Sequence, residues 1–93
     1  MRRIERDGQF KRDYKRELKG RHRTILKLTL SVIMQLLIYD HPLPAKYKDH
    51  ALTGNWKDCR NCHIKPDLIL IYRKPNDDVL QLARIGSHSE LGL

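Results

Sequence analysis

The chain has 93 residues, 40% of them hydrophobic, and its 19 lysines and arginines against 11 acidic residues give a net charge of +8. We expect one domain spanning residues 1–93, because domains typically contain about 100–150 residues. The positive charge favours an anionic partner such as nucleic acid, an acidic protein or a membrane surface. The longest apolar run is far shorter than the roughly 20 residues of a membrane-spanning helix. The basic start of the chain lacks the apolar stretch of a signal peptide, so a cytoplasmic protein is expected.

The first half of the sequence is expected to form a strand and two helices. Residues 2–6 are short and charged, as is typical of an edge strand. In residues 7–19 apolar side chains recur every fourth position, which predicts a helix with one narrow apolar stripe. A second helix is predicted from about residue 22 to 39, where two adjacent rows of apolar residues would face the core. These rows are Ile25, Leu28, Val32 and Leu36, and Leu26, Leu30, Ile33 and Leu37.

The second half of the sequence is expected to form a loop and three strands. Residues 40–55 contain two prolines and a Thr-Gly-Asn turn signal, which predict a loop. Strands are predicted over residues 56–63, 68–74 and 79–85, and the last two form a hairpin. This order indicates an α+β fold: an N-terminal strand and a two-helix hairpin packed on a mainly antiparallel sheet. The helices would cover one face of the sheet, and function is expected on the other face, which would be free.

Two cysteines precede a histidine in the pattern C-x-x-C-H, formed by Cys59, Cys62 and His63, which is typical of covalent haem attachment. The match is weak because haem attachment of this kind implies export, and residues three apart in a strand point to opposite faces. The same divergence, and the lack of a second ligand pair, argue against a zinc site. We therefore expect reduced cysteines, no metal and no cofactor.

Three histidines outside the predicted helices could meet at one rim of the sheet. They are His50, His63 and His88, and Asp67 follows the second of them closely. Metal-independent RNA cleavage needs a base for the ribose 2′-OH, an acid for the 5′-oxygen and positive charge near the phosphorus. Histidine serves the first two roles near neutral pH, and Arg84 is the best-placed candidate for the third. Unrelated histidines at the surface are the alternative interpretation.

Basic residues are the third feature of the sequence. Residues 11–23 are rich in lysine and arginine, and they form either a solvated helix face or a surface that follows nucleic-acid phosphates. Tyr47 and Trp56 could stack on bases, although a position beside a turn favours Trp56 as a core or rim residue. The candidate RNA-binding residues are Lys11, Lys15, Arg16, Lys57, Arg60 and Lys65.

Several segments of the second half resemble one protein family. The sequences LPAKYKDHALTGNWK at 43–57, RNCHIKPDLILIY at 60–72 and RIGSH at 84–88 are similar to YafQ-type toxins, a branch of the RelE/ParE superfamily. The resemblance implies a RelE-like fold and the toxin of a type II toxin-antitoxin system. Such a toxin is an mRNA interferase, a ribosome-dependent endoribonuclease that cuts mRNA in the ribosomal A site without a metal. Its partner would be a cognate antitoxin, commonly a ribbon-helix-helix protein, for which we expect an acidic carboxy-terminal segment.

The resemblance also implies which residues carry the function. The family's histidines and aspartate correspond to His50, His63, Asp67 and His88, and its phosphate-contacting arginine corresponds to Arg84. We assign proton transfer to His50 and His88, and positioning or polarisation to His63 and Asp67. Which residue is the base and which is the acid stays open.

Two positions depart from the family pattern. Leu68 stands where relatives often have an aromatic residue, and residues 91–93 lack the phenylalanine that relatives tend to carry. Both departures remove possible base-stacking surfaces. Two other functional classes compete with the nuclease: a toxin-fold protein that binds a target without cleaving it, and a basic nucleic-acid-binding module without RNase activity.

Overall fold

The computed structural model describes all 93 residues as helices, strands and short connections. Their order is β1 (Arg3–Arg6), α1 (Gly8–Leu18), α2 (Arg23–Ile38), η1 (Ala45–Tyr47), β2 (His50–Ala51), η2 (Gly54–Trp56), β3 (Arg60–Lys65), β4 (Leu68–Asn76), β5 (Val79–Gly86) and α3 (His88–Leu91), where η1 and η2 are 3₁₀ helices. The helices are all too short or too polar to span a lipid bilayer.

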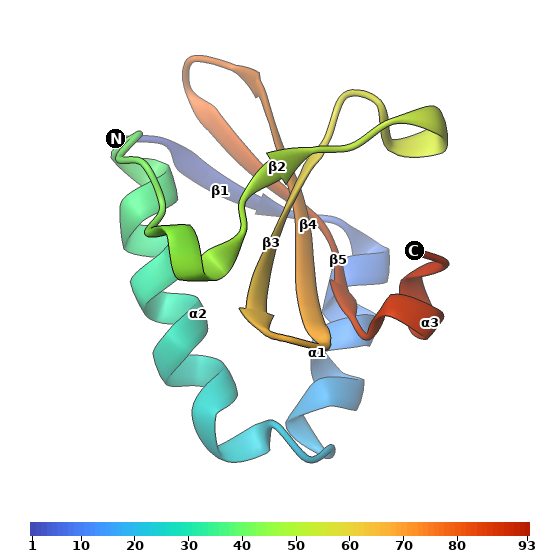
Figure 1. The fold of residues 1–93 in the computed structure, drawn as a ribbon. Helices are drawn as coiled ribbons and strands as arrows, with labels where there is room; N and C mark the ends of the chain where they lie inside the picture. Colours follow the sequence, from blue (N-terminus) through green and yellow to red (C-terminus); the bar gives the residue numbers. More distant parts are fainter.

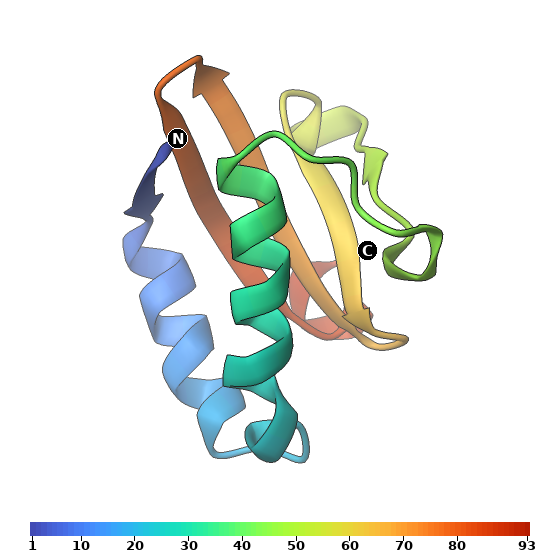
Figure 2. The ribbon, with the colours of Figure 1, turned by 90° about the vertical axis from the view of Figure 1, so that its left-hand side faces the viewer.

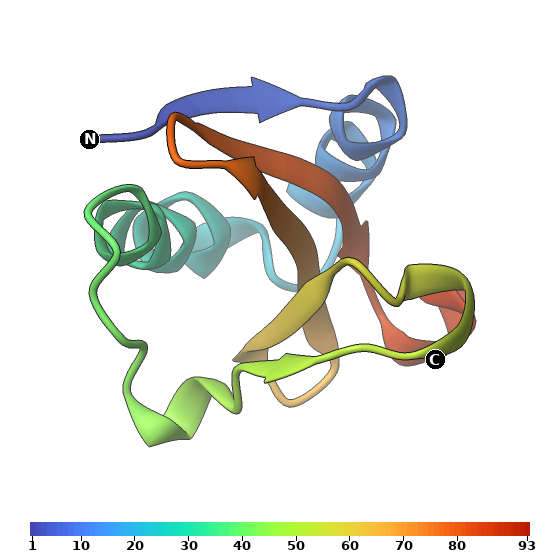
Figure 3. The same ribbon diagram turned by 90° about the horizontal axis from the view of Figure 1, so that it is seen from above.

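The five strands form one sheet in the order β1-β5-β4-β3-β2 (Figure 1). The β5–β4, β4–β3 and β3–β2 pairs are antiparallel, and β1 pairs with β5 in parallel at one edge. Viewed from above, β1 and β2 lie at opposite sides of the sheet (Figure 3). The α+β class, the N-terminal edge strand and the mainly antiparallel sheet predicted from the sequence are confirmed.

The main core lies between the sheet and the two long helices. Figure 2 shows α1 and α2 side by side in front of the sheet. The strand β4 contributes Leu68, Leu70 and Tyr72 to this core, and α2 contributes residues such as Leu26 and Ile33. Each fully buried leucine or isoleucine stabilises the fold by about 1.5–3 kcal/mol relative to an exposed position.

The prediction of a free second face is wrong, because the chain covers part of that face with its own loop and C-terminus. A smaller apolar cluster lies there, with Leu52 and Trp56 packed against it. Its buried members are Cys59, Ile69, Ile71, Ala83 and Leu91. The C-terminal residues reach this face because Ser87 and Glu90 form a capping box that starts α3. Coverage of both faces explains the continuous apolar run of β4.

The expectation that both apolar rows of α2 face the core is also wrong. The side chains of Leu28 and Val32 are 73% and 46% exposed, respectively. The buried stripe consists of Leu26, Leu30, Ile33, Met34, Leu37 and Ile38. A helix that lies against a sheet buries the stripe that faces it, so the adjacent row stays at the surface.

The segment between α2 and β4 differs from its prediction in two ways. The third strand of the sheet begins at Arg60 rather than at residue 56, because Gly54–Trp56 forms a 3₁₀ turn. Two residues of the predicted loop, His50 and Ala51, pair with β3 as an edge strand. This pairing fixes the position of His50 relative to β3.

Candidate active site

The three histidines predicted to meet do so on the second face of the sheet. His63 pairs in register with Ile69, a member of the smaller cluster, so both side chains lie on that face. The ring centroid of His63 is 6.4 Å from that of His50 and 5.4 Å from that of His88. His63 is therefore the central ring of the three, and each ring comes from a different element.

Asp67 anchors His88 through two contacts. Its Oδ1 atom accepts a hydrogen bond from the His88 backbone N–H at 2.9 Å and lies 2.6 Å from His88 Nδ1. The hydrogen bonds from the His88 backbone and ring lower the pKa of Asp67. The carboxylate is therefore ionised at neutral pH, Nδ1 carries the proton, and Nε2 is the nitrogen available to a reacting group. Arg21 lies 3.6 Å from the other carboxylate oxygen.

The surroundings of His63 and His50 define their protonation and orientation. Burial lowers the pKa of His63, and the neighbouring His88, Lys48 and His50 lower it further. His63 is therefore neutral at pH 7 and can accept a hydrogen bond. His50 Nδ1 lies 2.7 Å from the carbonyl oxygen of Lys48, and because a carbonyl only accepts, Nδ1 is the donor and Nε2 is left available.

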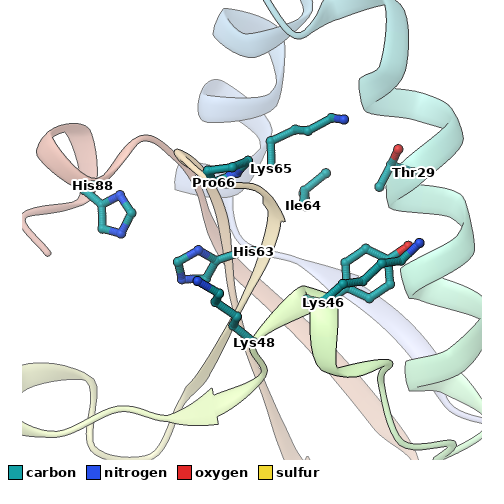
Figure 4. A pocket seen from close by; sticks show the side chains of 9 residues that line it. Thr29, Lys46, Lys48, His63, Ile64, Lys65, Pro66 and His88 are labelled. Carbon is teal, nitrogen blue, oxygen red and sulfur yellow. The ribbon is translucent and has the colours of Figure 1, made fainter.

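His63 and His88 open into a cavity of about 520 Å³ that continues around the end of β3 to α2 (Figure 4), whereas His50 and Asp67 are not among its lining residues. Lysines from η1, the following turn and β3 line it, and no carboxylate does. The lining residues are Thr29, Lys46, Tyr47, Lys48, His63, Ile64, Lys65, Pro66 and His88. Lys65 was predicted from the sequence, but Lys46 and Lys48 were not. The directions of their side chains depend on the 3₁₀ turn η1, and no periodic pattern in the sequence indicates them.

Arg84, the predicted phosphate-stabilising residue, is engaged elsewhere. Its Nε and Nη2 atoms donate to the Asp13 carboxylate at 2.7 and 3.1 Å, and Asp13 is fully buried on α1. Arg84 thus anchors α1 to β5 and is absent from the lining of the histidine cavity. Only the cations Lys46, Lys48 and Lys65 line that cavity.

The predicted RNA-binding residues do not form one surface. Lys11 and Lys15 line a separate, mostly apolar groove between α1, α2 and β1. Arg16 pairs with Asp13, Glu17 and Glu90, Arg60 pairs with Asp49, and Lys57 is exposed beside η2. Of the six predicted RNA-binding residues, only Lys65 lies in the histidine cavity.

The aromatic and sulfur side chains are mostly structural. Tyr47 is buried in the main core, and the Lys46 ammonium lies 5.1 Å from its ring centroid, so the ring offers no open face for a base. Trp56 packs against the smaller cluster, as favoured from the sequence. Cys59 and Cys62 are unbonded and lie in different clusters, on opposite faces as predicted. Burial raises the pKa of Cys62 to about 12, which keeps it a thiol.

Comparison with known proteins identifies the family. A family model described as the bacterial toxin of type II toxin-antitoxin system, YafQ, matches residues 2–92. The chain belongs to this family. The mRNA interferase toxin YafQ of Escherichia coli strain K12 is 47% identical to it over 89 residues, which cover 95% of this chain and 92% of the relative.

Solved structures of relatives share the fold. The crystal structure of YafQ from E. coli strain BL21(DE3) matches with a TM-score of 0.84 at 42% identity, over 98% of each chain. The crystal structure of the E. coli DinJ–YafQ complex matches with a TM-score of 0.79 at 40% identity, also over 98% of each chain. The family and the fold implied by the sequence resemblance are thereby confirmed.

Proposed function

We propose that this protein is an endoribonuclease toxin that cleaves mRNA with the histidine cluster. Membership in a family of type II toxins supports this function, and so does a curated relative that carries the name mRNA interferase. The observation that carries the proposal is the convergence of three imidazoles and one carboxylate beside a cavity lined by lysines. This set contains the proton donors and acceptors and the positive charge that phosphodiester cleavage requires.

In the proposed reaction the ribose 2′-OH attacks the adjacent phosphorus. One of His50 and His88 takes the 2′-OH proton through Nε2 as the O2′–P bond forms. The other donates a proton to the 5′-oxygen as the P–O5′ bond breaks, so the products are a 2′,3′-cyclic phosphate and a 5′-OH end. Both rings have Nδ1 held by an acceptor, which leaves Nε2 of each for this chemistry.

His63 and Asp67 act on these two rings and on the phosphate. Neutral His63 lies between the outer rings and donates or accepts a hydrogen bond at the phosphate, and Asp67 fixes the orientation and tautomer of His88. Lys48 supplies positive charge beside His63. Because side chains supply both the proton transfers and the charge, the proposed mechanism needs no metal at the site.

The proposed biological setting is translation. We infer cleavage of mRNA in the ribosomal A site, by a single toxin domain spanning residues 1–93 that acts in the cytoplasm. A relative has been crystallised as the DinJ–YafQ toxin-antitoxin complex. We propose that this chain likewise has a cognate antitoxin, of the ribbon-helix-helix type, whose acidic carboxy-terminal segment complements the +8 charge.

The test is cleavage of mRNA on ribosomes by single alanine variants of His50, His63, Asp67 and His88. The His50 and His88 variants are each expected to lose about 10²–10⁴-fold in rate, the usual contribution of a general acid or base. The His63 and Asp67 variants are also expected to cleave more slowly, because they lose the groups that position and polarise these rings and the phosphate. His41→Ala is the matched control, because His41 is an exposed histidine outside the cavity. Undiminished cleavage by all four variants would overturn the proposal. Growth inhibition by the wild type with intact mRNA would instead favour a toxin that binds its target without cutting it.

A further inference from the structure

The cavity has a second side that the proposed cleavage does not use. Figure 4 shows His63 and His88 on one side of the end of β3, and Thr29 of α2 on the other. Lys65 extends away from the histidines toward α2, and Lys46 lies on the same side of the cavity (Figure 4). Both sides belong to one continuous cavity of about 520 Å³.

The lysines on this second side have no acidic partner. Neither Lys46 nor Lys65 has a carboxylate oxygen within 4.0 Å, whereas Arg16, Arg60 and Lys74 are each paired with one or more carboxylates. Two uncompensated ammonium groups in one concave site repel each other and raise the local positive potential. An anion that enters the site relieves this repulsion.

The polar groups present favour a phosphate over a base. The Lys46 ammonium lies over the Tyr47 ring, which leaves that ring no face for stacking. Thr29 makes no side-chain hydrogen bond within the protein, so its hydroxyl can donate to an oxygen in the cavity. Ammonium and hydroxyl donors without an open aromatic ring are typical of contacts to the nucleic-acid backbone.

We propose that Thr29, Lys46 and Lys65 form a second phosphate subsite, which holds the phosphodiester next to the one being cleaved. This inference rests on the proposed function, which puts the scissile phosphate at the histidines. A strand bound there continues around the end of β3 into the α2 side of the cavity. The subsite fixes the register of the RNA without reading its sequence.

The test is binding of an uncleavable RNA tetranucleotide, whose central phosphodiester is the scissile one and whose second nucleotide is a 2′-deoxyribonucleotide, measured by fluorescence anisotropy in 0.1 M salt. Versions with one neutral methylphosphonate, on either side of the scissile phosphate, remove a single neighbouring charge. One of the two is expected to bind the wild type about fivefold more weakly, because a single-strand phosphate contact contributes a salt slope of about 0.7. The K46Q/K65Q double variant is expected to bind the unmodified RNA at least about fivefold more weakly and to lose this discrimination.

Lys27→Gln is the matched control, since it removes an exposed positive charge from α2 outside the cavity. The proposal is overturned if neither methylphosphonate weakens binding, if the double variant still discriminates, or if Lys27→Gln weakens binding as much as the double variant. Circular dichroism checks that each variant is folded. Because the RNA is uncleavable, these outcomes are independent of the cleavage assay, and a protein that fails to cut mRNA can still show or lack the subsite.

Discussion

Replacing Asp13 with asparagine is expected to lower the free energy of unfolding by about 3–5 kcal/mol, because this carboxylate holds α1 against the end of β5. Asp13 is fully buried. It accepts two hydrogen bonds from Arg84, at 2.7 and 3.1 Å, one from Arg16 at 3.1 Å, one from the Ile85 backbone N–H at 3.2 Å and a long one from Gln9 Nε2 at 3.5 Å. Five donors thus depend on one side chain.

The magnitude follows from what asparagine leaves behind. The amide keeps the shape of the carboxylate but loses its charge, so the Arg84 guanidinium, whose side chain is 20% exposed, has no counter-charge. Removing one partner of a buried ion pair costs about 3–5 kcal/mol. Arg16 adds little, because its side chain is 41% exposed and also pairs with Glu17 and Glu90. The loss is a large part of the roughly 5–15 kcal/mol by which small domains are stable.

The assay is equilibrium unfolding in urea, with Glu5→Gln as the control. Glu5 pairs with Arg3 at 3.0 Å, but both side chains are at least half exposed, so this variant is expected to lose less than about 1 kcal/mol. If Asp13→Asn loses no more than Glu5→Gln, the assignment of Asp13 as the anchor of α1 is refuted.

The pH dependence of the same variant gives a second readout. Burial alone would raise the pKa of Asp13, but the hydrogen bonds and charges of Arg84, the Ile85 N–H and Arg16 outweigh it and lower the pKa. A lowered pKa in the folded state means that its stabilisation is present above the ordinary carboxyl pKa of about 3.9 and is lost at more acidic pH. The wild type is therefore expected to lose more stability than Asp13→Asn as the pH falls below about 4.

Three further predictions concern the site and α2. Asp67→Leu is expected to slow ribosomal mRNA cleavage by about 10²–10⁴-fold, because it removes the oxygen that holds the His88 ring, which then loses its general acid–base role; an unchanged rate would contradict this. Lys48→Gln is expected to raise the pKa of His63 in an NMR titration, because the Lys48 charge lowers it; a lower pKa would contradict this. Leu28→Ser is expected to change the free energy of unfolding by less than about 0.5 kcal/mol, whereas Leu26→Ala costs about 2–5 kcal/mol; equal losses would contradict the observed orientation of α2.

The elements with strong periodicity could be predicted from the sequence, and those defined by tertiary contacts could not. Alternation and helical spacing located α1, α2, β4 and β5, with boundaries shifted by one or two residues. The two-residue strand at His50 has no pattern of its own and exists only because it pairs with β3. The capping box of Ser87 and Glu90, by contrast, could have been read from the sequence as the start of α3. The choice between the two apolar rows of α2 depends on how the helix lies against the sheet.

The same distinction applies to the site. The three histidines could be predicted to meet, because chemistry-bearing residues at strand ends and beside turns gather at one rim. The engagement of Arg84 with Asp13 joins residues 71 positions apart, and nothing local indicates it. Arg84 therefore looked unpaired in the sequence, whereas in the structure its guanidinium pairs with Asp13, and the cations that line the histidine cavity are lysines.

The way the three rings are held explains why Asp67 matters beyond its charge. Only His63 lies on a long strand; His50 is on a two-residue strand, and His88 begins a four-residue helix. Helices this short are unstable in isolation, so α3 depends on contacts outside itself. Asp67 provides one of them, because the oxygen that meets the His88 ring also accepts the His88 backbone N–H. The carboxylate therefore fixes both the start of α3 and the orientation of the ring that α3 carries, which couples the fold of the C-terminus to the geometry of the site.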